Sequence, residues 1–562
     1  MKFSQMPYER PDIEKLTKSM SEKTEALKAA ESYEAAREVF LDYLKEEAHI
    51  ATLASISNVR HSIDTRDEFY DAEDKFWSMN GPVIEEYAQL WLSALLENRF
   101  RPQFEEEFGS LYFTNKEMDR KTFKPEIIEE LQQENLLVQE YEDLLASSKI
   151  DFEGKTYTIT QMTPLKTDPD DARRLAAWKA EGQWYKDNQA KLDEYYDKLV
   201  HLRDEMGKKL GYGGYTQLGY YRMTRNCYDA EDLKKFRAAV VKYIVPLASK
   251  IYEAQAKRLG KAYPMNFADN AIDFRDGNPK PAGSADDVVA AGKKFYGELS
   301  PETKEFFETM LDCELLDLLA KEGKQGGGYC TDFPEYKLPF IFANFNGSQG
   351  DVEVITHEAG HAFEAWFNRE RVPYENAQAT MEACEVHSMS MEFFADPWAE
   401  DFFGGDAKKY YYSHLAGAIK FIPYGTMVDD FQHRMYEKPE MSPAERHAVW
   451  KELLGIYMPW VKLGEIPFYG DGEGWQRQHH IYSFPFYYID YCLAQTVSLE
   501  FWAMMQDDFE DAWKHYMAYT SQGGTATFTD LLKNAGMETP FDEDCFKAVC
   551  EKASKFLEEY EL

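Results

Sequence analysis

The segment from residue 340 to residue 361 reads FIFANFNGSQGDVEVITHEAGH, and it decides the fold around it. The aromatic and β-branched run 340–345 predicts a strand, and the polar, glycine-containing run 346–350 predicts a turn. A helix after the turn would carry His357 and His361 one turn apart on the same face, so both imidazoles could reach one metal ion. The strand then lies beside the metal, and we expect its free edge to be open to an extended peptide.

Glu358 follows the first histidine and completes an H-E-x-x-H pattern, the arrangement of zinc hydrolases. It projects beside the two imidazoles, close enough to act on a metal-bound water but not placed to be a third ligand. Gly360 costs about 1 kcal/mol of helix propensity relative to Ala. A close approach of another backbone at Gly360 would explain why a glycine stands there.

A third metal ligand must come from elsewhere, because catalytic zinc usually takes three protein ligands and leaves one position for water. Residues 380–392 predict a second helix, which offers Glu382, Glu385 and His387. We expect Glu385 to be the ligand, Glu382 to be the reserve and His387 to be a hydrogen-bonded helix residue. Glu392 either supports the site from behind or is solvated.

Two imidazoles and a carboxylate would let zinc lower the pKa of its water and polarise a carbonyl oxygen. Glu358 would take the proton of that water and pass it to the leaving amine. The oxyanion needs a further donor, and the chain offers His479, His480, Tyr488 and Tyr491, the two tyrosines sharing a helix face. Such a Tyr-rich helix is otherwise more often a core with satisfied hydroxyls.

The composition argues against two classes of binding partner. The net charge of −37 over 562 residues repels nucleic acid and anionic membranes, so we expect neither as a partner. The N-terminus has no apolar core of a signal peptide, and no run of 18 apolar residues occurs. The 7 cysteines are scattered and form no metal-binding pairs, which fits free thiols. These features predict a cytoplasmic protein.

Residues 1–150 predict a helical N-terminal lobe, rich in Ala, Leu, Glu and Lys. A hairpin predicted at 150–159 marks a soft boundary, and residues 151–562 form the catalytic region, with the metal core at about 325–505. The glycine-rich run 323–328 lacks a phosphate-loop pattern and predicts a flexible loop.

Several segments together resemble the M3 metallopeptidases, most closely their oligoendopeptidase F / Pz-peptidase branch. The resemblance covers most of the chain from about residue 150 onward and, more loosely, the helical part before it. The segments that carry it are 357–361, the preceding 344–348 and 351–352, the block 385–392, the segment 211–223 and the His/Tyr segment 478–491.

The resemblance implies one zinc ion per chain, bound by His357, His361 and Glu385, with Glu358 as general base. It implies a mainly α fold: a two-lobed helical shell around a deep substrate channel, with a small β-sheet beside the metal. Substrates would be short oligopeptides, because folded proteins cannot enter such a channel.

The family's oxyanion donors, a His and one or two Tyr, carry over to His479 or His480 and to Tyr488 and Tyr491. Phe484 stands where some relatives have a Tyr, so one phenol is absent or comes from Tyr482 or Tyr487.

The expected activity is that of a metalloendopeptidase, a zinc hydrolase that cuts internal bonds of unstructured peptides. A carboxypeptidase or dipeptidyl carboxypeptidase on a similar shell is the enzymatic alternative. A non-catalytic peptide-binding protein with structural zinc is the alternative from another class. Structural zinc is usually closed by four ligands, often Cys, and this site offers no Cys pair.

Overall fold

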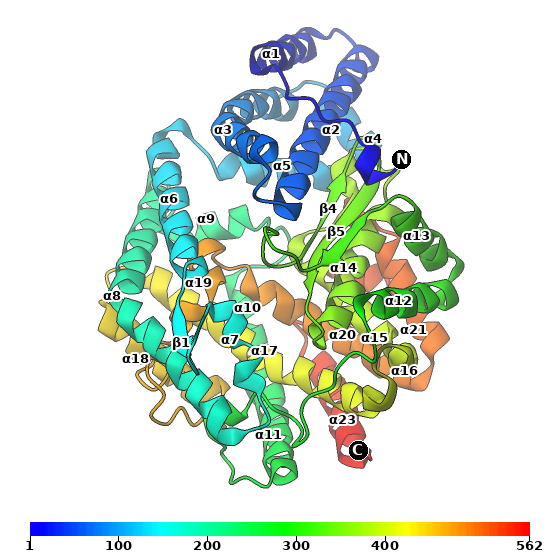
Figure 1. Ribbon diagram of the computed structural model, residues 1–562. Coiled ribbons are helices and arrows are strands. Elements are labelled where there is room, and N and C mark those ends of the chain that lie inside the picture. Colours follow the sequence, from blue (N-terminus) through cyan, green and yellow to red (C-terminus); the bar gives the residue numbers. More distant parts are fainter. Residues whose placement is uncertain (562) are drawn as a thin grey trace. The chain divides into compact units, whose positions relative to one another are not determined.

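The computed structural model describes residues 1–561, and helices dominate it (Figure 1). The predicted mainly α fold with a small sheet is confirmed. The chain forms two compact units, each assembled from several segments. Unit 1 comprises residues 1–120, 280–407 and 504–537, and unit 2 comprises 121–279, 408–503 and the residues from 538 onward.

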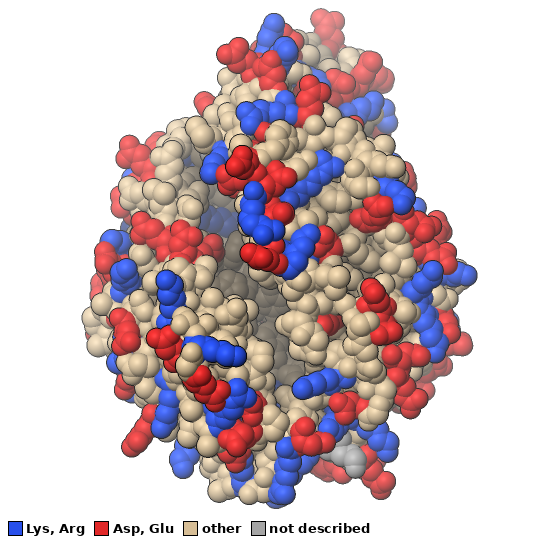
Figure 2. Space-filling view, in the orientation of Figure 1, with Lys and Arg blue, Asp and Glu red and all other residues tan. Residues whose placement is uncertain are grey.

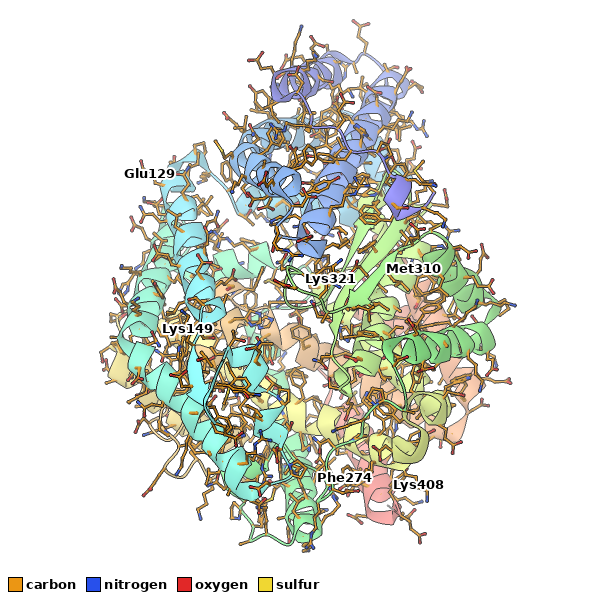
Figure 3. All side chains as sticks on the ribbon, in the orientation of Figure 1. Glu129, Lys149, Phe274, Met310, Lys321 and Lys408 are labelled. Carbon is orange, nitrogen blue, oxygen red and sulfur yellow. The ribbon has the colours of Figure 1, made fainter. Side chains whose placement is uncertain are left out.

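The predicted boundary at residue 150 falls inside unit 2, because the chain leaves unit 1 after residue 120 and returns to it at residue 280. The predicted metal core likewise draws residues from both units. In Figure 3, Lys408 marks the point at which the chain enters unit 2 for the second time. The division into an N-terminal lobe, residues 1–150, and a catalytic region, residues 151–562, therefore stays a prediction.

The helices of unit 1 begin at side chains that cap them. The Asp12 carboxylate accepts the Lys15 N–H at the start of α1, and the Ser32 hydroxyl accepts the Ala35 N–H at the start of α2. The first helices bury a core that includes Phe40. The helices of this unit are α1 (Ile13–Ala29), α2 (Tyr33–Ile63), α3 (Glu68–Leu96), α4 (Arg101–Phe108), α5 (Ser110–Lys121), α12 (Ala285–Leu299), α13 (Pro301–Asp312), α14 (Gly350–Phe367), α15 (Met381–Phe394), α16 (Ala399–Phe403), α21 (Phe509–Thr520) and α22 (Phe528–Asn534).

A three-stranded sheet in unit 1 precedes α14, the helix that carries His357 and His361. Its order is β3 (Leu316–Leu319), β5 (Leu338–Phe345), β4 (Tyr329–Phe333), with β5 parallel to β3 and antiparallel to β4. The predicted sequence of strand, turn and helix is confirmed by β5 and α14. The prediction that this strand has a free edge is wrong, because β5 is the middle strand of the sheet and is hydrogen-bonded to a neighbour on each side. Only an outer strand can accept a further strand.

Unit 2 contains the predicted hairpin, in which Glu153 and Gly154 take positive φ angles of 51° and 77° between the paired strands. The Asp170 carboxylate then caps a helix of 39 residues. The elements of this unit are α6 (Ile128–Ala146), β1 (Ile150–Phe152), β2 (Lys155–Tyr157), α7 (Ile159–Met162), α8 (Asp171–Lys209), α9 (Tyr215–Arg222), α10 (Ala230–Ala239), a π-helix (Val240–Ile244), α11 (Val245–Leu259), most of α17 (Ala407–Glu437), α18 (Pro443–Tyr457), α19 (His479–Ser483), most of α20 (Tyr488–Asp507) and α23 (Glu543–Glu559).

The surface carries both signs of charge. On the face drawn in Figure 2, Lys and Arg side chains are scattered among Asp and Glu, although acids outnumber bases by 100 to 63 in the whole chain. Within residues 1–561, no helix combines the length and apolar character that a membrane span requires.

Candidate metal centre

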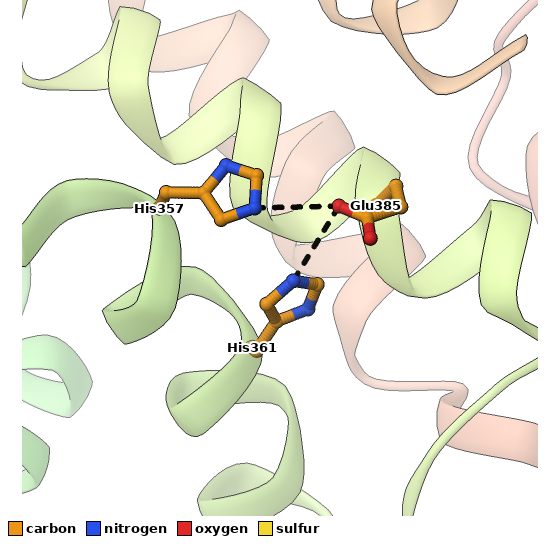
Figure 4. A group of neighbouring side chains, drawn as sticks. All are labelled: His357, His361 and Glu385. Carbon is orange, nitrogen blue, oxygen red and sulfur yellow. Dashed lines mark ion pairs between the residues drawn. The ribbon is translucent and has the colours of Figure 1, made fainter. Parts of the chain in front are cut away.

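Two helices of unit 1 bring three side chains to one point (Figure 4). The Nε2 atoms of His357 and His361 on α14 lie 3.4 Å and 3.5 Å from the same oxygen, Oε2 of Glu385 on α15. One ligand atom from each residue lies within 4.8 Å of the others. The three residues expected to bind metal are therefore neighbours.

The spacing fits a single small cation. With zinc–ligand bonds of about 2.0–2.1 Å and tetrahedral angles, two ligand atoms on one zinc ion lie roughly 3.3–3.5 Å apart. The two nitrogen–oxygen distances fall in this range. A donor set of two imidazoles and one carboxylate is also the chemistry of catalytic zinc.

Side chains behind the ligands orient them. The Nδ1 atom of His357 lies 2.7 Å from Oε1 of Glu392, so the carboxylate holds the Nδ1 proton and leaves Nε2 to face Glu385. The Ser388 hydroxyl donates to Oε2 of Glu385 at 3.0 Å. Of the two alternatives for Glu392, support from behind the ligand is confirmed.

Burial and the neighbouring charges shift the pKa values of His357 and Glu385 in opposite directions. Burial lowers the pKa of His357, but Glu385 and Glu392 outweigh it and hold that pKa well above its ordinary value. Burial raises the pKa of Glu385, but His361 and His357 outweigh it and hold that pKa well below its ordinary value. Glu385 is therefore an ionised carboxylate, ready to face a cation.

Glu358 lies on α14 beside the ligands and is not part of the three-residue group. Burial raises its pKa, and the two histidines oppose that rise. A carboxyl group with a raised pKa binds a proton more readily than an exposed one. It is therefore better suited to proton transfer near neutral pH.

Gly360 allows α14 and α15 to touch through their backbones. A Cβ at this position would lie 2.6 Å from Cα of Ser388 and 2.7 Å from the carbonyl oxygen of His387. The close approach expected from the glycine is confirmed. It brings Glu385, one turn earlier on α15, within reach of the two histidines.

Changing Gly360 to Ala is expected to destabilise the fold by about 1–3 kcal/mol, because the new methyl group forces two backbones apart. This loss occurs although Ala favours a helix over Gly by about 1 kcal/mol. Gly297→Ala on α12 is the matched control, since a Cβ there meets nothing within 4 Å. Urea unfolding measures the free energy of unfolding of both variants. A Gly360→Ala protein as stable as the control would contradict the packing argument.

The other candidates for the third ligand have different surroundings. Glu382 is fully buried on α15 and is not a member of the metal group. His387 is also buried, with Nε2 3.3 Å from Oε1 of Glu364 and Nδ1 3.2 Å from the Thr520 hydroxyl. As expected, His387 is a hydrogen-bonded helix residue.

Helix α21 covers α15 on the side of His387. The hydroxyl of Tyr516 donates to the His387 carbonyl at 3.1 Å, and the hydroxyl of Tyr519 donates to the Ala383 carbonyl at 3.2 Å. The helix that carries Glu385 is thus fixed from a segment far along the chain.

The expected oxyanion donors lie together in unit 2. The ring centroid of His480 is 3.9 Å from that of His479, 4.8 Å from that of Tyr488 and 5.9 Å from that of Tyr491. Tyr487 joins them, with its ring centroid 5.8 Å from that of His480. This cluster belongs to unit 2, whereas the metal group belongs to unit 1.

Tyr482 does not belong to this cluster. It is fully buried, its hydroxyl donates to the Leu192 carbonyl at 3.2 Å, and its ring stacks on Tyr141. Of the two tyrosines proposed to replace the phenol missing at Phe484, only Tyr487 therefore lies beside the candidate donors.

A strained turn places the tyrosines at the start of α20. Phe486 has a φ of 68°, which is uncommon for a residue with a side chain. The Arg225 guanidinium holds this turn: it donates to the Phe486 carbonyl at 2.7 Å and pairs with the Asp490 carboxylate at 2.5 Å. Gly219 on α9 leaves room for the ring of Phe486, which a Cβ there would approach to 2.6 Å. Sequence reasoning missed Arg225, which carries no local pattern.

Comparison with known proteins agrees with this geometry. Residues 164–550 match the family described as "Peptidase family M3", and residues 3–123 match "Peptidase M3 N-terminal domain". A solved structure of a candidate oligoendopeptidase F has a TM-score of 0.94 at 43% sequence identity, with 100% of this chain and 99% of that chain covered. Pz peptidase A with an inhibitor has a TM-score of 0.94 at 42% identity, with 99% of both chains covered.

A curated relative is more distant. The oligoendopeptidase F homolog of Borreliella burgdorferi is 23% identical over 339 residues, which are 56% of this chain and 54% of that protein. The chain thus spans about half the length of this relative.

Proposed function

The chain belongs to peptidase family M3, and from this premise we propose that it is a zinc-dependent endopeptidase that hydrolyses internal bonds of short, unstructured peptides. The observation that carries the proposal is the convergence of His357 Nε2 and His361 Nε2 on one oxygen of Glu385, at 3.4 Å and 3.5 Å. This donor set and spacing suit one zinc ion, with a remaining position for water.

His357, His361 and Glu385 would hold the metal, with Glu392 orienting His357. Zinc, when bound, lowers the pKa of a water molecule toward neutrality and polarises a peptide carbonyl. Glu358 would accept the proton of the attacking water and pass it to the leaving amine.

The family resemblance implies that a His and one or two Tyr donate to the oxyanion. His480 or His479, together with Tyr488 and Tyr491, would donate hydrogen bonds to the carbonyl oxygen as negative charge develops on it. Such donors act most strongly where water is excluded, which suits the enclosed channel that the family resemblance implies.

An extended peptide could pair with β4, an outer strand of the sheet. Gly328 directly precedes this strand, and a Cβ on it would lie 3.9 Å from Oε1 of Glu358. A peptide paired there would run close to the general base. Oligopeptide substrates and a cytoplasmic location stay predictions.

The test is cleavage of internally quenched fluorescent peptides of graded length, with the fragments mapped by mass spectrometry. We expect a chelator to abolish cleavage and added zinc to restore it, and we expect cleavage to fall sharply above a limiting length. Cleavage that persists after the metal has been removed would exclude the proposed chemistry.

The same assay separates the alternatives. Blocking the peptide C-terminus leaves an endopeptidase active but stops a carboxypeptidase or dipeptidyl carboxypeptidase. Retention of peptide without any cleavage by the zinc-loaded protein would indicate a binding protein instead.

A further inference from the structure

His480 is held by a chain of side chains that starts on another helix of unit 2. The Gln478 amide nitrogen Nε2 lies 2.7 Å from Nδ1 of His480. The Tyr424 hydroxyl on α17 donates to the Gln478 amide oxygen at 2.8 Å. Gln478 itself is buried, at 9% exposure, so water competes little for its amide group.

This arrangement selects one form of the His480 ring. An amide nitrogen carries two hydrogens and can only donate, so Nδ1 of His480 must accept. A neutral imidazole that accepts at Nδ1 carries its proton at Nε2. In this orientation the Tyr424 hydroxyl donates to the oxygen end of the Gln478 amide, and the nitrogen end is turned toward His480.

The neighbouring His479 has no comparable hydrogen bond among the described residues. Within the described residues, the ring of His479 makes contact with the ring of His480 but no hydrogen bond. His480 is also the ring next to which Tyr487, Tyr488 and Tyr491 gather. The two histidines compete for one role in the sequence, and only one of them is prepared as a donor.

We propose that Gln478 is a positioning residue that fixes His480 as an Nε2–H donor to the carbonyl oxygen of a bound peptide, with Tyr424 holding Gln478 in its orientation. This inference rests on the proposed peptidase function and identifies which histidine serves it. Gln478 acts through His480 and does not itself touch the substrate.

Two substitutions of Gln478 test the proposal in opposite ways. Gln478→Leu removes the donor to Nδ1 and leaves the tautomer of His480 unconstrained. Gln478→Glu places an acceptor there, which draws the proton to Nδ1 and, at a pH at which the ring is uncharged, favours the wrong tautomer. Tyr424→Phe removes only the group that orients the amide, so its effect should be the smallest of the three.

Peptide cleavage and nitrogen-15 NMR of histidine-labelled protein provide two independent measurements. We expect Gln478→Leu to lower kcat by roughly 10-fold and Gln478→Glu by up to about 100-fold, with KM changed less than about 2-fold; complete loss of one oxyanion donor costs about 10²–10³-fold. In the NMR spectrum, His480, assigned by its loss in His480→Gln, should be protonated at Nε2 in the unchanged protein and at Nδ1 in Gln478→Glu.

Gln189→Leu is the matched control. It breaks another glutamine–histidine contact of unit 2, in which Gln189 Nε2 lies 3.2 Å from Nε2 of His447, and it should leave kcat unchanged. Thermal unfolding of all variants shows that each remains folded.

Two results would overturn the inference: a kcat of both Gln478 variants equal to that of Gln189→Leu, or a His480 ring protonated at Nδ1 in the unchanged protein. If the zinc-loaded, unchanged protein cleaves no peptide, the proposed function fails instead, while the NMR experiment still decides whether Gln478 sets the His480 tautomer.

Discussion

Replacing Glu358 with Gln is expected to lower turnover by about 10²–10⁴-fold, because the amide keeps the size of the side chain but cannot take a proton. Metal binding should be unchanged, since Glu358 is not one of the three residues that converge. The measurements are kcat on a fluorescent peptide and the zinc content per chain by elemental mass spectrometry.

Glu353→Gln provides the control on the same helix. Glu353 accepts a hydrogen bond from Gln349 near the start of α14 and lies outside the metal group. It undergoes the same chemical change as Glu358, so any general effect of removing a carboxylate from α14 appears in both variants. A Glu358→Gln protein that retains normal turnover would remove Glu358 from the mechanism.

Loss of zinc is the expected result of replacing Glu385 with Gln, and activity should disappear with it. The amide removes the negative charge from the oxygen at which both imidazoles converge. The affinity for zinc should fall by more than the roughly 10–100-fold caused by losing a group behind a ligand. Equilibrium dialysis against buffered zinc measures this change.

Glu382→Gln is the informative comparison, because Glu382 lies one turn earlier on α15 and was the reserve ligand. It should keep its zinc, since it is not a member of the three-residue group. Circular dichroism shows whether both variants are folded. Zinc retained by Glu385→Gln and lost by Glu382→Gln would reverse the assignment of the third ligand.

Local periodicity explains what could be predicted. The spacing of His357 and His361 places both on one helix face whatever surrounds it, and a glycine in the middle of that helix indicated a close neighbour. A helix period alone does not say which face of α15 meets α14, so spacing could not decide between Glu385 and Glu382 as the third ligand.

Long-range pairing explains what could not be predicted. The sequence of β5 predicts a strand but does not specify that β3 and β4 flank it on both sides. Likewise, no local pattern links Tyr424 to Gln478, which are 54 positions apart in the chain. Tyr482 and Tyr487 look alike in the sequence, and only the packing shows that the first is buried beneath Tyr141.

The covering of α15 by α21 has a consequence for biosynthesis. All three ligands leave the ribosome long before Tyr516 and Tyr519, whose hydroxyls fasten the helix behind Glu385. Chains grow from the N-terminus at about 5–20 residues per second, so a nascent chain carries the ligands for several seconds without the helix that braces them. A chain that stops before residue 516 would therefore carry its three candidate ligands on an α15 that no tyrosine hydroxyl of α21 supports.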